Sequence, residues 1–170
     1  GVPQDSLKTN RRYNSSGTEK PGTPYKDEVD DYLQTHYQLF YNHQWNQYWK
    51  SNIAFLLTRG KGYYEQYKGS AELSSYGLPV YINGTDTTSE TDLARRLWLD
   101  NYFYGGIYSV QHKKNNTEFT LGGAFTKYDG KHYGNIIWAQ AQKAVPSNYR
   151  WYNLTAYKRD ISTFAKWAQQ

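Results

Sequence analysis

Residues 35–45 read THYQLFYNHQW, and they decide the fold class because aromatic or aliphatic side chains recur at every second position. Tyr37, Leu39, Tyr41 and Trp45 are odd-numbered, whereas glutamine and asparagine fill most of the even positions between them. A period of two puts alternate side chains on opposite faces of an extended chain. The segment therefore predicts a β-strand with one apolar face.

The same alternation recurs and predicts four further strands. Residues 49–59 alternate in this way and continue past Gly60-Lys61-Gly62, where the glycines indicate a bulge or a bend. The other strands are predicted at residues 93–113, 118–128 and about 153–167. The breaks near residues 46 and 115 are short enough for hairpin turns, so the first four strands are expected to form two hairpins.

Long polar segments rich in turn-forming residues separate these hairpins. Residues 1–32 are predicted to form a polar N-terminal loop, and long loops are predicted at residues 65–91 and 129–151, with a short strand possible at residues 79–82. Strands then fill most of the range from about 33 to 168. The predicted fold class is all-β: antiparallel up-and-down strands, joined by alternating short turns and long loops, in a curved partial barrel sheet. Outer-membrane barrels alternate short turns and long loops in this way. We therefore expect residues 1–170 to form one partial β-barrel segment.

Composition excludes several classes of protein. Only 38% of the 170 residues are hydrophobic while 18% are aromatic, a balance that suits half-wet strand surfaces better than a helical core. The chain has no cysteine, so disulfides, thiolate zinc sites and cysteine nucleophiles are excluded. The net charge of +5 comes from scattered basic residues, so a nucleic-acid partner is not expected.

Four stretches together resemble the mid-barrel of TonB-dependent outer-membrane receptors. They are HYQLFYNH at residues 36–43, LTRGKGYYEQY at 57–67, DLARRLWLDNYFYGG at 92–106 and LGGAFTKYDGKH at 121–132. They occur in the family's order and spacing, and the resemblance covers roughly residues 1–167. It implies a piece of a twenty-two-stranded barrel in the bacterial outer membrane, without the plug domain that closes such a barrel.

The resemblance also implies a function and partners. The family imports nutrients, most commonly iron chelates such as a siderophore or haem. The expected partners are a nutrient chelate, outer-membrane lipid and, through the missing plug, an energy-coupling inner-membrane complex. Because an excised barrel segment has open sheet edges and a lipid-facing stripe, the isolated chain is expected to self-associate.

Basic and aromatic residues gather where the predicted strands meet the first long loop. They predict a cationic, aromatic-lined mouth that holds an anionic chelate. The alternative is that the arginines anchor the outer rim by bonding backbone or lipid phosphate. The ligand-contact candidates are Arg59, Tyr63, Tyr64, Arg95, Arg96, His132 and Trp138, and Lys61 stands beside the first of them.

Catalytic and metal sites are not predicted. Of the four histidines, His36 and His43 are separated by an odd number of residues and so lie on opposite faces of a regular strand. No carboxylate pair or nucleophile motif is present, so neither an enzyme nor a cofactor is expected. The rival interpretation is a secreted carbohydrate-binding β-module with exposed Tyr and Trp platforms. Strands in such modules average about 5–6 residues, whereas the runs here exceed about ten.

Overall fold

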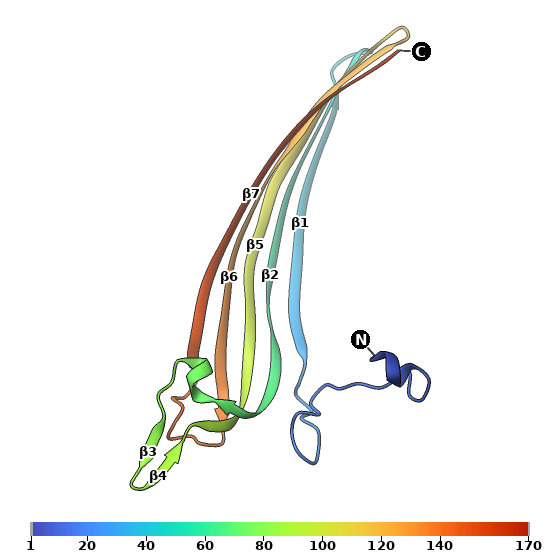
Figure 1. Ribbon diagram of the computed structural model, residues 1–170. Helices are drawn as coiled ribbons and strands as arrows, with labels where there is room; N and C mark the ends of the chain where they lie inside the picture. The colour runs from blue at the N-terminus through green and yellow to red at the C-terminus, as the bar shows by residue number, and fades with distance from the viewer. Residues whose placement is uncertain (1, 170) are drawn as a thin grey trace. The chain divides into compact units, whose positions relative to one another are not determined.

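The computed structural model describes residues 2–169, most of which belong to β-strands (Figure 1). The long strands are β1 (Asp30–Gln44), β2 (Trp49–Glu72), β5 (Glu90–Lys114), β6 (Thr117–Ala139) and β7 (Tyr149–Gln169). Two short strands, β3 (Tyr81–Asn83) and β4 (Asp86–Thr88), and two single 3-10 turns, η1 (Gln4–Leu7) and η2 (Leu73–Tyr76), complete the described elements. No helix within residues 2–169 has the length and apolarity needed to cross a membrane.

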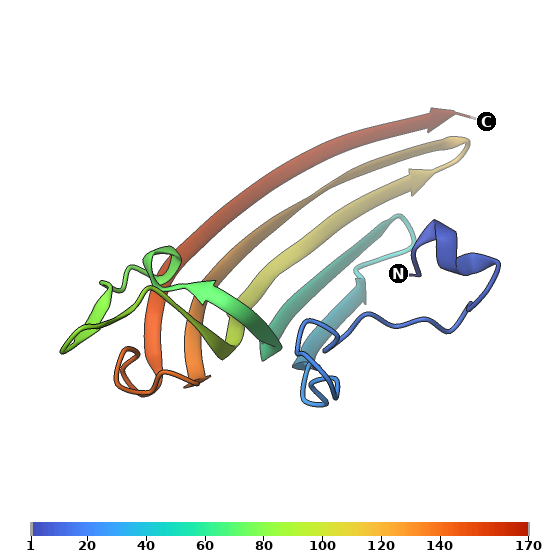
Figure 2. The same cartoon turned by 60° about the horizontal axis from the view of Figure 1, so that its bottom comes forward.

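The five long strands form one antiparallel sheet in the order β1-β2-β5-β6-β7 (Figure 2). Each long strand pairs with the next long strand along the chain, and the sheet is open rather than closed. The hairpin β3–β4 forms a separate two-stranded sheet, in which Tyr81 pairs with Thr88 and Asn83 pairs with Asp86. The predicted all-β, antiparallel, up-and-down architecture is confirmed.

Side-chain chemistry explains the tight turns. Between β1 and β2, the Asn46 side chain accepts hydrogen bonds from the backbone N–H groups of Tyr48 and Trp49. These bonds stabilise a tight turn. Between β5 and β6, Asn115 adopts a positive φ of 53°, a conformation that asparagine tolerates better than most residues. These are the two short turns that the sequence predicts.

The predicted long loops are shorter than expected because the strands run further. Strand β2 continues to Glu72 and β6 to Ala139, so residues 65–72 and 129–139 are strand and not loop. The connection from β2 to β5 covers residues 73–89, and that from β6 to β7 covers residues 140–148. Strand β1 begins at Asp30, within the predicted N-terminal loop. The turn-forming residues in these stretches are compatible with long strands once neighbouring strands supply hydrogen bonds.

The chain divides into two compact units. Strands β2, β5, β6 and β7 each run through both units, whereas β1 belongs almost entirely to the second. Unit 1 comprises the residues up to 31 together with 63–98 and 133–153, and unit 2 comprises residues 32–62, 99–132 and those from 154 onward. Unit 1 holds the hydrophobic core, in which η2 and the connection at residues 140–148 bury Leu73, Leu93 and Ile136 completely. Every buried hydrophobic side chain among residues 2–169 belongs to unit 1. Unit 2 is therefore a sheet segment without a core of its own.

Candidate functional site

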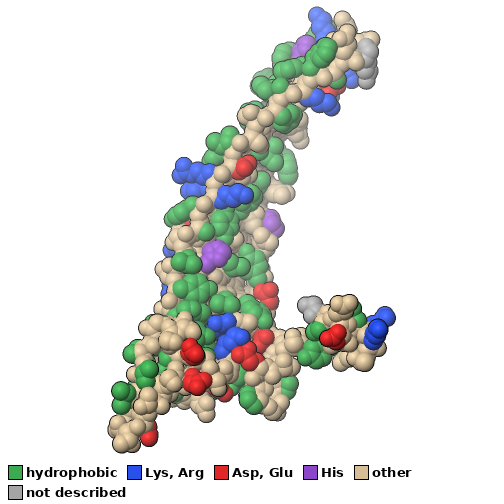
Figure 3. Space-filling view, viewed as in Figure 1, with side chains coloured by type: hydrophobic (Ala, Val, Ile, Leu, Met, Phe, Trp, Pro, Cys, Tyr) green, Lys and Arg blue, Asp and Glu red, His purple; other side chains and the backbone are tan. Residues whose placement is uncertain are grey.

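Unit 2 has one apolar face, here called the band face. Contacts across the strands identify it: Phe55 lies beside the position that a side chain at Gly106 would occupy, and Tyr108 lies beside the corresponding position at Gly123. Alternation along each strand then assigns the remaining members. The band face comprises Leu33, Thr35, Tyr37, Leu39, Tyr41, Ser51, Ile53, Phe55, Leu57, Tyr102, Tyr104, Gly106, Tyr108, Val110, Phe119, Leu121, Gly123, Phe125, Ile161, Thr163 and Ala165. The listed residues are uncharged, but alternation along β7 also places Arg159 on the band face, next to Ile161. Figure 3 shows hydrophobic side chains at the surface along the strands.

The opposite face of unit 2, the polar face, is joined by side-chain hydrogen bonds. They link His36 Nδ1 to Thr58 (2.9 Å), Tyr32 to Asn101 (2.9 Å), Asn52 to Ser109 (3.2 Å) and Gln111 to Glu118 (2.7 Å). The alternate residues of β1 on this face are mostly amides, and those of β7 include Lys158, Asp160 and Lys166. Phe40, Ile107 and Phe164 also lie on this face and are exposed, so it is a mixed face, more polar than the band face.

Distinct side chains bound the band face along the strands. At one end Arg59 pairs with Asp100 at 2.5 Å and lies over the Tyr102 ring at 4.4 Å, and Lys127 contacts the rings of Tyr104 and Tyr157. At the other end aromatic rings pack on histidines: Trp49 lies 4.6 Å from His112, and Trp45 lies 4.5 Å from His43. Amphipathic rings and long cationic side chains are typical of the edges of an apolar layer.

A groove lies in the middle of the band face, over the glycines of β5. Its volume is about 670 Å³, and its walls include Ile53, Phe55, Tyr108, Phe125 and Ile161. Ile161 is 76% exposed and Phe55 is 58% exposed, although both are large and apolar. Contiguous exposed apolar patches of this kind are typical of surfaces that contact another protein, a membrane or a ligand.

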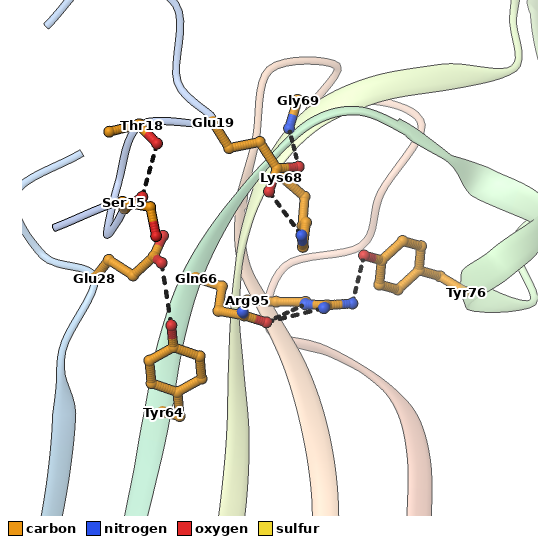
Figure 4. Close-up of polar contacts among 10 residues, drawn as sticks. All are labelled: Ser15, Thr18, Glu19, Glu28, Tyr64, Gln66, Lys68, Gly69, Tyr76 and Arg95. Carbon is orange, nitrogen blue, oxygen red and sulfur yellow. Dashed lines mark hydrogen bonds and ion pairs between the residues drawn. The ribbon is translucent and has the colours of Figure 1, made fainter. Parts of the chain in front are cut away.

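In unit 1, Arg95 is the centre of a polar cluster, here called the Arg95 cluster. Its guanidinium donates to Gln66 Oε1 from two nitrogens (2.9 and 3.3 Å) and to the Tyr76 hydroxyl (3.0 Å), and Figure 4 shows it between these two side chains. The Trp151 ring centroid lies 5.9 Å from the guanidinium carbon. The charge of Arg95 is therefore fully engaged within the wall that connects β2, β5 and η2.

The N-terminal segment is tied to unit 1 by nearby polar contacts, also drawn in Figure 4. Tyr64 donates to Glu28 at 3.1 Å, while Lys68 pairs with Glu19 at 2.7 Å. Glu19 also accepts the backbone N–H of Gly69. These contacts fix a segment that the sequence predicts only as a polar loop.

A row of three aromatic rings with an arginine at each end crosses four strands of unit 1. Arg96 lies over Tyr63 (4.1 Å), Tyr63 packs on Trp98 (4.8 Å), Trp98 stacks on Tyr133 (5.7 Å), and Arg150 lies over Tyr133 (4.0 Å). We call this row the ring ladder. Arg96 also pairs with the buried carboxylate of Glu65 at 2.7 Å. Guanidinium groups held on ring faces keep N–H donors available for an anion.

The predicted ligand-contact residues thus fall into separate places. Tyr63 and Arg96 come together in the ring ladder, while Tyr64 and Arg95 make different contacts, because consecutive residues of a strand point to opposite faces. Arg59 belongs to unit 2, where it also bonds the carbonyl oxygens of Asn101 and Gly60. The seven candidates therefore do not line a single mouth, because neighbouring side chains along a strand point to opposite faces.

His132 and Trp138 lie in strand β6 rather than in a loop. The His132 Nε2 atom lies 3.1 Å from the Tyr128 hydroxyl, and Trp138 stacks on Tyr67 with 6.4 Å between ring centroids. Within residues 2–169 no three His, Asp or Glu side chains come close enough to hold a metal ion.

Sequence reasoning missed a group of tyrosines bound to carboxylates in unit 1. Tyr25 donates to Glu65 at 2.5 Å, and Tyr67 donates to Asp92. Asp92 also accepts the backbone N–H of Ser70 at 2.8 Å. The signal was the continued alternation Tyr63, Glu65, Tyr67 beyond the predicted end of the strand. Comparisons of the chain with protein-family models, with curated proteins and with solved structures find no match.

Proposed function

We propose that this chain is a segment of the barrel wall of a TonB-dependent outer-membrane receptor, which imports a nutrient such as an iron chelate. In this proposal the band face of unit 2 contacts lipid, and residues 32–62, 99–132 and 154–169 are the membrane-spanning segments. The observation that carries the proposal is a combination found in unit 2: an exposed, largely apolar face, an opposite face joined by side-chain hydrogen bonds, and no buried hydrophobic side chain among its described residues. Strands with this alternation are stable where lipid covers one face and water the other.

The lengths of the strands and the edges of the band face support the same proposal. A tilted strand needs about 9–11 residues to cross a bilayer, and β2, β5, β6 and β7 have 24, 25, 23 and 21 residues. They are long enough to span the membrane and to extend beyond it into unit 1. The groove over Gly106, with its apolar walls, has the shape and polarity to receive a lipid acyl chain.

Ligand capture in this proposal belongs to unit 1, which contains the long connections and all the candidate residues except Arg59 and His132. Arg59 and Arg95 are bound to backbone carbonyls or neighbouring side chains, which supports a role in holding the wall. Arg150 lies on the ring face of Tyr133 and is better placed to meet an anionic chelate or a lipid phosphate, whereas Arg96 lies on Tyr63 but is also paired with Glu65. The rival secreted sugar-binding module is less well supported, because its short strands would not need an exposed apolar face of this extent.

The test is size-exclusion chromatography with light scattering, first in aqueous buffer and then in mild detergent, with circular dichroism on both samples. A β-rich oligomer in buffer that becomes smaller or better ordered in detergent is the expected result, because detergent covers the band face. A compact β-rich monomer whose size and spectrum do not change with detergent would contradict the proposal and favour the sugar-binding module.

A further inference from the structure

Unit 1 contains a cavity that is separate from the Arg95 cluster. Its volume is about 400 Å³, and Lys20, Tyr25, Tyr67, Ala94 and Trp138 line it. The volume falls in the range of about 300–1,000 Å³ that small-molecule sites occupy. Three of the five lining residues are aromatic, so the walls consist largely of ring faces.

The aromatic walls are held in place by hydrogen bonds behind them. The Tyr25 hydroxyl is bound to Glu65 and the Tyr67 hydroxyl to Asp92, so both rings are fixed at their outer ends. Burial, together with the bond to Asp92, raises the pKa of Tyr67 to about 12, so this hydroxyl keeps its proton. The Tyr25 N–H also donates to the carbonyl of Gly17, whose φ of 73° lies in the left-handed region, and this bond closes a loop within the N-terminal segment.

The orientation of the rings bears on the shape of a ligand. Tyr25 and Tyr67 are inclined by 37°, and Tyr67 and Trp138 by 26°, so the three rings do not share one plane. A flat aromatic ligand would lie on only one ring at a time. A puckered sugar ring, whose C–H groups point in several directions, can contact aromatic rings that lie in different planes.

Charge indicates a second property of the ligand. Lys20 is the only charged residue among those that line the cavity within residues 2–169. The neighbouring carboxylates are already engaged, because Glu65 binds Arg96 and Tyr25, and Asp92 binds Tyr67 and Ser70. An acid group on the ligand would therefore find its complement at the Lys20 ammonium.

We propose that this cavity binds an acidic sugar residue, with the sugar ring against the exposed ring of Trp138 and its acid group on Lys20. This site goes beyond the proposed transport role and does not depend on it, because all of its residues belong to unit 1. A transporter segment and a soluble protein would both present it.

The test is titration of the 170-residue chain in mild detergent with D-glucuronate, D-glucose and benzoate, followed by saturation-transfer NMR of the ligand protons. Glucuronate is expected to bind about fivefold more tightly than glucose, the gain from one partly exposed ion pair. Lys20→Gln should remove this preference, whereas Lys8→Gln, a matched change in the same N-terminal segment, should leave it unchanged. Trp138→Leu should weaken glucuronate binding at least tenfold, while Trp138→Tyr, which keeps a ring, should retain most of it.

Circular dichroism of each variant separates loss of binding from loss of fold. The inference is overturned if benzoate binds as tightly as glucuronate, if glucuronate does not bind the folded chain, or if the folded Trp138→Leu variant binds normally. Failure of the transport proposal gives a different result, since a monomer indifferent to detergent would still bind glucuronate. A detergent-responsive oligomer that binds no sugar would overturn this inference alone.

Discussion

Leu39 and Gln38 provide a sharp test of the band face. They are consecutive residues of β1, both are exposed, and alternation places Leu39 on the band face and Gln38 on the polar face. Arginine at either position adds the same charge and the same volume at nearly the same depth. In water the two variants should have equal stability, because neither side chain is buried.

The expected difference in a bilayer follows from the position of Leu39 along its strand. Leu39 lies six residues from Trp45 at the aromatic edge, which is about 20 Å along a strand at ~3.3 Å per residue. For a strand tilted by about 45°, this corresponds to ~14 Å of depth, close to the middle of a hydrocarbon core about 30 Å thick. Arginine on the lipid face at that depth costs about 2–4 kcal/mol. Since ~1.4 kcal/mol changes an equilibrium tenfold, Leu39→Arg should reduce insertion about 30- to 1,000-fold.

The assay is co-flotation of the purified chain with phospholipid vesicles of neutral lipid, with unfolding in urea measured in parallel. Leu39→Arg should lose most of its vesicle binding, and Gln38→Arg should retain binding close to that of the unmodified chain. The lipid-facing assignment is refuted if both variants lose binding equally, or if Leu39→Arg binds as well as Gln38→Arg.

Three further changes test other parts of the structure. Gly123→Ala should destabilise the chain by about 1–3 kcal/mol in urea unfolding, because the added methyl group meets the Ser162 carbonyl at 2.6 Å. Gly106→Ala should be tolerated, because its methyl group meets nothing nearer than Phe55 at 3.5 Å, and equal effects of the two changes would contradict this packing. Asp100→Asn should cost about 1 kcal/mol by removing the charge partner of Arg59, while Glu118→Gln, whose pair with Lys113 is 3.9 Å long and exposed, should cost less than about 0.5 kcal/mol in the same assay. The bonds from Tyr67 and from the Ser70 N–H hold the pKa of Asp92 below its ordinary value of 3.8. The contribution of Asp92 to stability is therefore present above pH 3.8 and is lost as the pH falls through the lowered pKa. In an acid titration followed by near-UV circular dichroism, Asp92→Asn should flatten this part of the curve, and an unchanged curve would argue against the role of Asp92.

Local sequence pattern was sufficient to predict the strands and their two-faced character. Residues 35–45 alternate because each side chain in an extended chain has its direction set by its neighbours alone. The turns at Asn46 and Asn115 were likewise predictable, because asparagine stabilises tight turns through its own side chain and backbone preferences. The antiparallel order of the long strands then follows from short connections.

The lengths of the loops and the composition of the site depended on tertiary structure. Residues 65–72 contain turn-forming types, yet they are strand because neighbouring strands pair with them. The cavity brings Lys20 and Tyr25 to Tyr67 and Trp138, residues that are far apart along the chain. Arg95 and Arg96 are adjacent in sequence, but one binds Gln66 and Tyr76 and the other binds Glu65 and Tyr63. The sequence by itself determined the direction of each side chain relative to its strand, which is a local property; only the folded chain decided which groups meet, because that depends on the register between strands and on the path of the connections.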